Sequence, residues 1–415
     1  MISTTYWKAA CLSLLLFPGF NFAQTIPIET LIQKTLTSHP EILAAKAKKE
    51  SLMRLVEQSS VGLNPSLDLS VGRKSNNQKS GLTYETTLKQ TIVNSEKINS
   101  KKALAQVEVF EQDLELKKLT SKLRYEVLTE AYNWNRYHQQ FEFNQARMKK
   151  LNWIKQYLAS RPFIAPQKRL EIKLIESHLR ELQAESLQLS SQKALARAAL
   201  QALISEPLPE ELAIALPKIQ FKTTPNVALL SEKIGSQNSE VQVLKIQLEE
   251  VELEKNVLQA DAKSDFDIFG RYASESASET EQFLSVGIGM DLAFANKNRF
   301  AIQAQNKKMD VLQAELDQLT KENTRKLQQA VISLKNSQDI LTLYNNTWLQ
   351  QLEASLDQSI DGFKKGQTEL LSVLELESQW DNASAKSYEA EATWINSWSI
   401  LMQLTNEAHL PGDSL

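Results

Sequence analysis

The side chains that most often carry enzyme chemistry are scattered through this sequence. Its only cysteine, Cys11, lies in an apolar N-terminal run, and its many Asp and Glu residues lie on the faces of predicted helices. We find no nucleophilic triad, no glycine-rich phosphate loop and no paired carboxylates. No two of its 4 histidines have the spacing of a metal-binding pair. The sequence therefore predicts a protein that is not an enzyme and binds no cofactor or metal. The histidines are His39, His138, His178 and His409.

One stretch has a regular alternation of side chains that indicates a physical role instead. In Phe283–Arg299, every second residue from Leu284 to Phe294 is apolar, and the residues between are small or polar. Because successive side chains of a strand point to opposite faces, this segment has one apolar face. Its length matches the roughly 9–11 residues of a tilted strand that crosses a bilayer. A half-buried strand of a soluble sheet would alternate in the same way. The side chains expected to face lipid are Leu284, Val286, Ile288, Met290 and Leu292.

Long helices are the second feature that the sequence predicts. The chain has 415 residues but only 11 glycines, and none occurs between Gly81 and Gly235. Helical patterns without Gly or Pro run from about Asn94 to Ser160 and from about Asn298 to Ile360. The first would be roughly 100 Å long as one helix, which is typical of a coiled coil or a tubular bundle. The net charge of −3 gives no reason to expect nucleic acid as a partner.

The N-terminus has the features of a secretory signal peptide, which we assign to residues 1–23. Lys8 precedes the apolar run Ala9–Phe17, and Ala23 provides the small residue before the expected cut. The mature chain should therefore lack cysteine and carry no disulfide or acyl anchor. No later segment has the pattern of a membrane-spanning helix, so we expect an exported protein that is periplasmic, secreted or an outer-membrane barrel.

The remaining chain repeats one order of elements with an offset of about 200 residues. Each repeat predicts a helix, a β-hairpin, a long helix, a turn and a returning helix. The first repeat covers 24–205, with strands at about 65–73 and 81–90. A proline-rich linker covers 206–225. The second repeat covers 226–415, with strands at about 265–273 and 283–294.

Two hairpins supply four predicted strands, which cannot close a barrel within one chain. In lipid, an open sheet edge leaves backbone groups unpaired at several kcal/mol each, so a membrane role requires several chains. The long helices carry too many Lys, Glu and Gln residues to lie in lipid, and they must therefore run away from the membrane. The sequence thus predicts a mainly α protein with a small β part, in which a tube of helices continues a barrel.

This combination resembles the TolC-like outer-membrane efflux protein family, also called outer membrane factors. The resemblance covers the chain after Ala23 and rests on the duplication and on three further motifs. These are Asn64-Pro65 before the first strand, Val286–Arg299 leading into the second long helix, and Phe363–Gly366 with the following Leu371–Leu374. The stretch Leu292–Asn306, with its Asn298-Arg299, is closer to the CzcC-like cation-efflux branch.

The resemblance implies a homotrimer that forms a transmembrane β-barrel in the outer membrane and a helical α-barrel through the periplasm. Its partners would be outer-membrane lipid, a periplasmic adaptor (membrane fusion) protein and an inner-membrane pump of the RND or ABC type. The family position of the two helical turns implies that they dock on the adaptor. The docking residues would be Arg161, Pro162, Phe163, Gly362, Phe363, Lys364, Lys365 and Gly366.

The resemblance also implies a gate at the periplasmic end of the tunnel, formed by residues just past the turns. Glu375 follows Gly366 by nine positions, Ser372 stands where many relatives carry an Asp, and Glu369 lies one turn earlier. One acid repeated by symmetry would form a negative ring that selects cations. Solvated helix residues are the alternative interpretation of these acids.

Two hypotheses of different classes follow. The first is an exit duct, the passive outer-membrane channel of an efflux or type I secretion system. The second is a periplasmic or secreted coiled-coil scaffold without channel activity. Matched hairpins at equivalent points of a duplication favour the duct, whose exported substrate, whether a metal cation, a drug or a protein, would be set by its pump.

Overall fold

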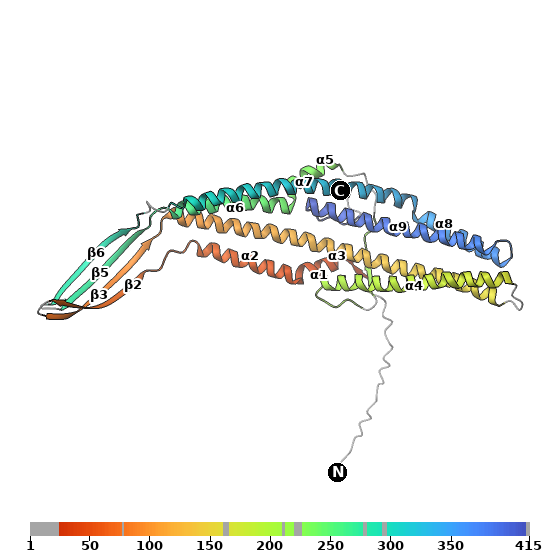
Figure 1. Ribbon diagram of the computed structural model, residues 1–415, viewed down its shortest axis with the longest axis horizontal. Coiled ribbons are helices and arrows are strands. Elements are labelled where there is room, and N and C mark those ends of the chain that lie inside the picture. Colours follow the sequence, from red (N-terminus) through yellow and green to blue (C-terminus); the bar gives the residue numbers. More distant parts are fainter. Residues whose placement is uncertain are drawn as a thin grey trace, which may run out of the picture.

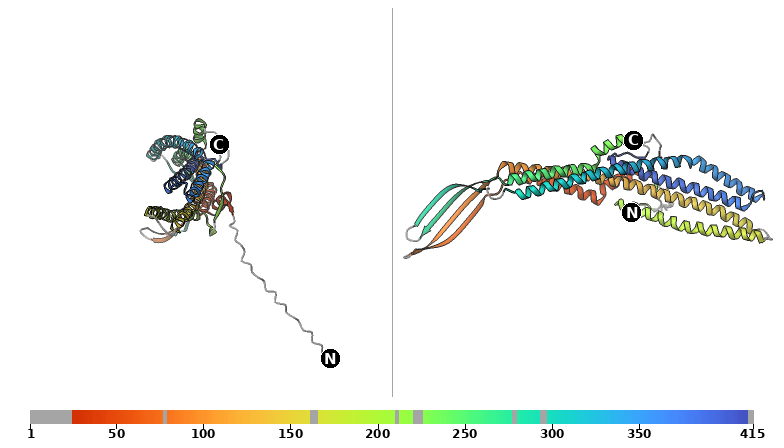
Figure 2. Two further views of the ribbon diagram at one scale, coloured as in Figure 1. Left: turned by 90° about the vertical axis from the view of Figure 1, so that its right-hand side faces the viewer. Right: turned by 45° about the horizontal axis from the view of Figure 1, so that its top comes forward.

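The computed structural model describes residues 25–76, 79–160, 166–209, 212–219, 226–276, 280–292 and 297–411. The predicted signal peptide lies outside these ranges. The molecule is a long rod with a β-sheet at one end and two helical turns at the other (Figure 1). It is narrow in cross-section when viewed along its long axis (Figure 2).

Four antiparallel strands form the terminal sheet, in the order β2-β3-β5-β6. Both predicted hairpins are present, and their inner strands β3 and β5 pair along their lengths, with Ile92 opposite Phe266. The outer strands β2 and β6 each have one neighbour, so the sheet has two open edges. The strands are β2 (Ser66–Asn76), β3 (Lys79–Ile92), β5 (Phe266–Ser276) and β6 (Thr280–Met290).

The first repeat contains the longest helix, α3, which has 65 residues and starts at a side-chain cap. The Asn94 side chain accepts a hydrogen bond from the Glu96 backbone N–H at 2.9 Å, which satisfies one free donor of the first turn. No glycine or proline interrupts the helix afterwards. The helices of this half are α1 (Ile28–Ser38), α2 (Pro40–Gln58), α3 (Ser95–Ala159) and α4 (Pro166–Leu203).

The second repeat differs from the prediction in its long helix, which is broken. Tyr344 leaves the helical conformation (φ −100°, ψ 49°), and a new helix begins after Asn345. The Asn345 side chain caps that helix by accepting a hydrogen bond from the Trp348 N–H at 3.0 Å. The helices of this half are α5 (Val227–Gln237), α6 (Ser239–Asp261), α7 (Arg299–Leu343), α8 (Asn346–Lys364) and α9 (Leu370–Thr405).

A second, very small sheet joins the start of the first repeat to the linker near the middle of the rod. Strand β1 (Thr25–Pro27) pairs in parallel with β4 (Ala213–Ala215), which lies in the predicted linker. Neither strand was among those predicted from the sequence. Among the described residues, no helix combines the length and the apolar character that a membrane crossing requires.

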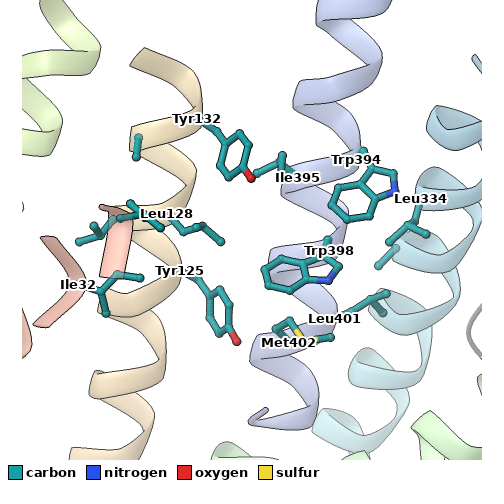
Figure 3. Close-up of a cluster of buried hydrophobic side chains, with 14 of the residues drawn as sticks. Ile32, Tyr125, Leu128, Tyr132, Leu334, Trp394, Ile395, Trp398, Leu401 and Met402 are labelled. Atoms are coloured by element: carbon teal, nitrogen blue, oxygen red, sulfur yellow. The ribbon is translucent and has the colours of Figure 1, made fainter. Parts of the chain in front are cut away.

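The main core lies beside this small sheet, where α3, α7 and α9 meet. Trp394 and Trp398 of α9 stack with ring centroids 6.3 Å apart, and Tyr125 of α3 meets Trp398 edge to face at 5.7 Å. Figure 3 shows the two tryptophans between the tyrosines of α3 and Leu334 of α7. A second core fills the helical end, which we call the tip, where α3, α4, α8 and α9 pack together.

Candidate functional site: an exposed apolar sheet and a helical tip

The terminal sheet has one apolar face and one polar face. Residues paired across neighbouring strands share a face, so the register places Leu67 with Leu88, and Ile268 with Ile288. The predicted alternation in β6 is therefore extended by matching apolar rows on the other three strands. The large apolar side chains of this face are Leu67, Leu69, Val71, Leu82, Tyr84, Leu88, Ile92, Phe266, Ile268, Tyr272, Leu284, Val286, Ile288 and Met290.

These side chains are exposed to an unusual degree. Leu284, Val286 and Ile288 are 78%, 80% and 77% exposed, and no helix covers them (Figure 1). A contiguous apolar surface of this kind marks a site of contact with a membrane or with another protein. The apolar face is therefore the first candidate functional surface.

Strand β6 contains all but the last member of the predicted lipid-facing row. Strand β6 ends at Met290, whereas the prediction continued it to Phe294 and placed Leu292 in it. Met290 pairs with Phe266, the first residue of β5, so the ladder has no partner for the next residues. Leu292 follows the strand and is 67% exposed, and Phe294 lies outside the described residues.

The opposite face of the sheet carries ion pairs between strands. Lys89 Nζ lies 2.7 Å from Asp267 Oδ2, and Arg271 bonds Glu85 at 2.5 Å. Lys74 of β2 reaches across β3 to Glu275 of β5. A sheet that is apolar on one side and lined with paired charges on the other separates lipid from water without a further layer of protein.

The helices next to the sheet are open on the same sides as the sheet. Helix α6 packs against both α3 and α7, whereas its counterpart α2 packs mainly against α3. Strand β2 and strand β6 likewise lack a second neighbour. Both the sheet and the helical wall are thus open on the same two sides of the chain.

At the other end of the rod, the α8–α9 turn depends on two glycines. Gly366 has φ +72°, which other residues rarely adopt, and its N–H donates to the Phe363 carbonyl at 3.1 Å. The Gln367 N–H donates to the Gly362 carbonyl at 2.9 Å. A Cβ on Gly362 would lie 2.5 Å from the Thr368 hydroxyl oxygen, so this position requires close approach.

The predicted docking residues divide into a buried and an exposed group. Phe363 is 5% exposed and packs in the tip core, where Tyr157 meets it edge to face, so a partner cannot reach it directly. Lys364 is held by Asp361 at 2.6 Å and lies 4.2 Å from the centre of the Trp153 ring. Lys365 and Gly366 are exposed at the turn. The predicted residues of the first turn, Arg161, Pro162 and Phe163, lie outside the described residues.

The three predicted gate residues lie together on one side of the α9 region. Glu369, Ser372 and Glu375 recur every three positions and are all exposed. Glu375 Oε1 accepts a hydrogen bond from Gln379 at 3.0 Å, and this pair continues the polar stripe along the helix. The opposite side of α9, with Val373 and Leu374, packs into the tip core.

A buried ion-pair network that was not predicted from the sequence joins the two repeats. Arg147 of α3 is 6% exposed and donates to Glu377 and Asp381 of α9, both at 2.6 Å. Burial raises the pKa of the Asp381 carboxyl, and the Arg147 charge opposes this shift. The two acids lie four positions apart on one face of a helix, but the sequence alone did not identify Arg147 as their partner.

No protein-family model and no curated protein matches this sequence. The fold nevertheless matches solved structures over most of its length. The open state of the MtrE outer membrane channel of Neisseria gonorrhoeae has a TM-score of 0.74 and 13% identity, covering 92% of this chain and 89% of that chain. The CmeC outer membrane channel of Campylobacter jejuni gives 0.73 and 11%, covering 93% and 87%. The outer membrane protein VceC of Vibrio cholerae gives 0.69 and 14%, covering 92% and 96%.

Identities this low establish the fold alone. This chain has the fold of outer-membrane channels, with long helices and a small four-stranded sheet. The fold class that the TolC-like resemblance implied is therefore confirmed.

Proposed function

We propose that this protein is the outer-membrane channel subunit of a tripartite efflux or type I secretion system. One observation carries the proposal. A four-stranded sheet with an exposed apolar face and two open edges lies at the end of a long polar helical rod. Strands of 11 residues, tilted by about 45°, match the thickness of a bilayer core.

The open edges support an assembly of several chains. In lipid, the unpaired backbone groups of β2 and β6 would each cost several kcal/mol, and pairing β6 of one chain with β2 of the next removes this cost. The fold family implies a homotrimer, in which the polar face of the sheet lines the lumen. A coiled-coil scaffold, the alternative function, gives no reason for an apolar face of this size.

The exit duct would be passive and would extend from the outer membrane of a Gram-negative cell into the periplasm. The solved structures that share its fold are outer-membrane channels rather than enzymes. At the tip, the exposed Lys365 and Gly366 support docking of the turn on a periplasmic adaptor, which connects the duct to an RND- or ABC-type pump. Assignment to the cation-efflux branch and the role of Glu369, Ser372 and Glu375 as the gate remain predictions.

Two neighbouring residues of β6 provide the test. Ile288→Arg places a charge on the lipid face, which costs roughly 2–4 kcal/mol at the bilayer midplane. Gly289→Ser changes the opposite face, where a Cβ would meet Asp267 at an ordinary 3.5 Å. We expect the wild-type protein and Gly289→Ser to reach the outer membrane and to conduct ions in planar bilayers, and Ile288→Arg to be strongly depleted from that membrane.

Equal outer-membrane levels of the two variants would contradict the assignment of the lipid face. A wild-type protein that fractionates with the periplasm and forms no pores would favour the scaffold.

A further inference from the structure

Polar contacts join the two repeats inside one chain where the helices meet the sheet. The β3–α3 junction lies beside the connection between α6 and β5. Lys97 Nζ lies 2.8 Å from Asp265 Oδ2, and the Asn94 backbone N–H donates to Asp265 Oδ1 at 2.9 Å. Glu96, the second residue of α3, pairs with Lys263 of the α6–β5 connection. We call this contact region the inner seam.

The duplication defines the equivalent positions at the open sides of the chain. Helix α7 follows β6 as α3 follows β3, and Asn298 is the N-cap residue of α7 as Asn94 is of α3. Phe300 is therefore the counterpart of Glu96. The connection between α2 and β2 is the counterpart of the α6–β5 connection, and it contains Val61 and Leu63.

At these open positions, apolar side chains replace the charged pair. Phe300 is 82% exposed, and Val61 and Leu63 are 60% and 58% exposed. Hydrogen bonds to neighbouring elements hold both segments in place. The Leu63 carbonyl accepts a hydrogen bond from Gln90 at 3.0 Å, and the Asn298 side chain donates to the Leu258 carbonyl at 2.8 Å.

We propose that Phe300 packs against Val61 and Leu63 of a second copy of this chain and forms the seam between subunits. The inference rests on the proposed channel function, because it uses the pairing of β6 with β2 of the next copy. That pairing would bring the start of α7 beside the neighbour's α2–β2 connection, as pairing of β3 with β5 brings Glu96 beside Lys263. Figure 1 shows the start of α7 and the α2–β2 connection at the same end of the helical rod.

The difference in chemistry between the two seams has a physical reason. Within one chain, the covalent connection already holds the two surfaces together, and a solvent-exposed ion pair adds little to their association. Separate chains lose translational and rotational freedom when they associate, and burial of apolar surface is the main favourable term that offsets this loss. Apolar residues are therefore expected at the seam between subunits and are not needed at the inner seam.

Paired cysteines test the contact, because the only native cysteine is Cys11 in the predicted signal peptide. We expect Phe300→Cys with Leu63→Cys, and Phe300→Cys with Val61→Cys, to give covalent oligomers up to the full ring with a short bismaleimide. The matched control is Glu96→Cys with Lys263→Cys at the inner seam, which should cross-link within one chain and leave a monomer on denaturing gels. Each single cysteine should give no ladder.

A charge exchange provides an independent readout. Phe300→Glu should lower the yield of detergent-stable oligomer several-fold, and adding Leu63→Lys should restore much of it by recreating the pair of the inner seam.

Two outcomes would overturn the inference while leaving the channel function intact. One is that the wild-type protein forms pores while the variants with paired cysteines at positions 300 and 63 or 300 and 61 never cross-link between chains. The other is that brominated phospholipids strongly quench the fluorescence added by Phe300→Trp while the paired-cysteine variants give no cross-link, which would assign this side chain to the membrane. A wild-type protein without pores or oligomers would instead reject the proposed function.

Discussion

The two helical hairpins of the tip have the same order of elements but differ in continuity. In the first, α3 runs for 65 residues without a break before α4 returns. In the second, 45 residues of α7 are followed by the break at Tyr344–Asn345 and by 19 residues of α8 before α9 returns. Lys386 of α9 donates to the Tyr344 hydroxyl at 3.3 Å, so a contact from the returning helix holds the break in place.

This difference indicates which hairpin can move. Helix α8 is about 28 Å long and has a non-helical joint at each end. It is held against α3 by the Tyr157 hydroxyl, which donates to the Lys364 carbonyl at 2.7 Å, and by Lys150 beside Glu353 at 3.4 Å. The first hairpin has no such joint in α3. If the tip of the proposed channel widens, we expect α8 and the start of α9 to move relative to α3.

The largest expected loss of stability comes from removing Arg147, which links α3 of the first hairpin to α9 of the second. Arg147→Ala would leave Glu377, 4% exposed on its side chain, as a buried charge without its partner. The free energy of unfolding should fall by roughly 3–5 kcal/mol. Urea unfolding of the helices, followed by circular dichroism in detergent, measures this change.

Lys150→Ala, one turn along α3, is the matched control. Its partners Asp357 and Glu353 are 58% and 45% exposed, so the loss should stay below about 1 kcal/mol. Similar losses for both variants would show that the two hairpins are not joined mainly through Arg147.

A smaller effect is expected at the α8–α9 turn. Gly366→Ala forces a Cβ into a left-handed backbone conformation and should destabilise the tip by about 1–2 kcal/mol. Gly235→Ala in α5 is the control, because a Cβ there meets nothing within 4 Å and Ala favours a helix. Equal urea midpoints for the two variants would mean that the turn does not need the conformation seen at Gly366.

The smallest expected effect on stability is at the predicted gate. Glu375→Gln changes an exposed side chain and should leave stability within about 0.5 kcal/mol. If three copies of Glu375 line the constriction, the variant should show weaker cation preference and weaker block by divalent cations in planar bilayers. Glu181→Gln on α4, 70% exposed, should change neither property. Unchanged selectivity in Glu375→Gln would place this residue outside the pore.

The sequence predicted the features that depend on local pattern. The alternation from Leu284 to Met290 predicted β6 and its apolar face, and the lack of glycine and proline predicted α3. The break at Tyr344 was not predicted. Asn345 caps the next helix, but this single residue stands inside an otherwise regular helical pattern.

Features that depend on distant parts of the chain could not be predicted. The end of β6 at Met290 is determined by where its partner β5 begins. The strands β1 and β4 have three residues each and gain their structure only from one another. The pairing of Arg147 with acids on α9 depends on how two long helices are aligned, which no local pattern specifies.

The central pairing of β3 with β5 has a consequence for the order in which the protein folds. Thr91 and Asp267 bond across these strands although they lie 176 positions apart in the sequence. Closing so long a loop costs entropy, whereas each hairpin closes through a short turn. We therefore expect each hairpin to form before the four-stranded sheet, which needs the helices between the hairpins to pack side by side. The apolar face of the sheet would then be completed only after the helical rod has folded.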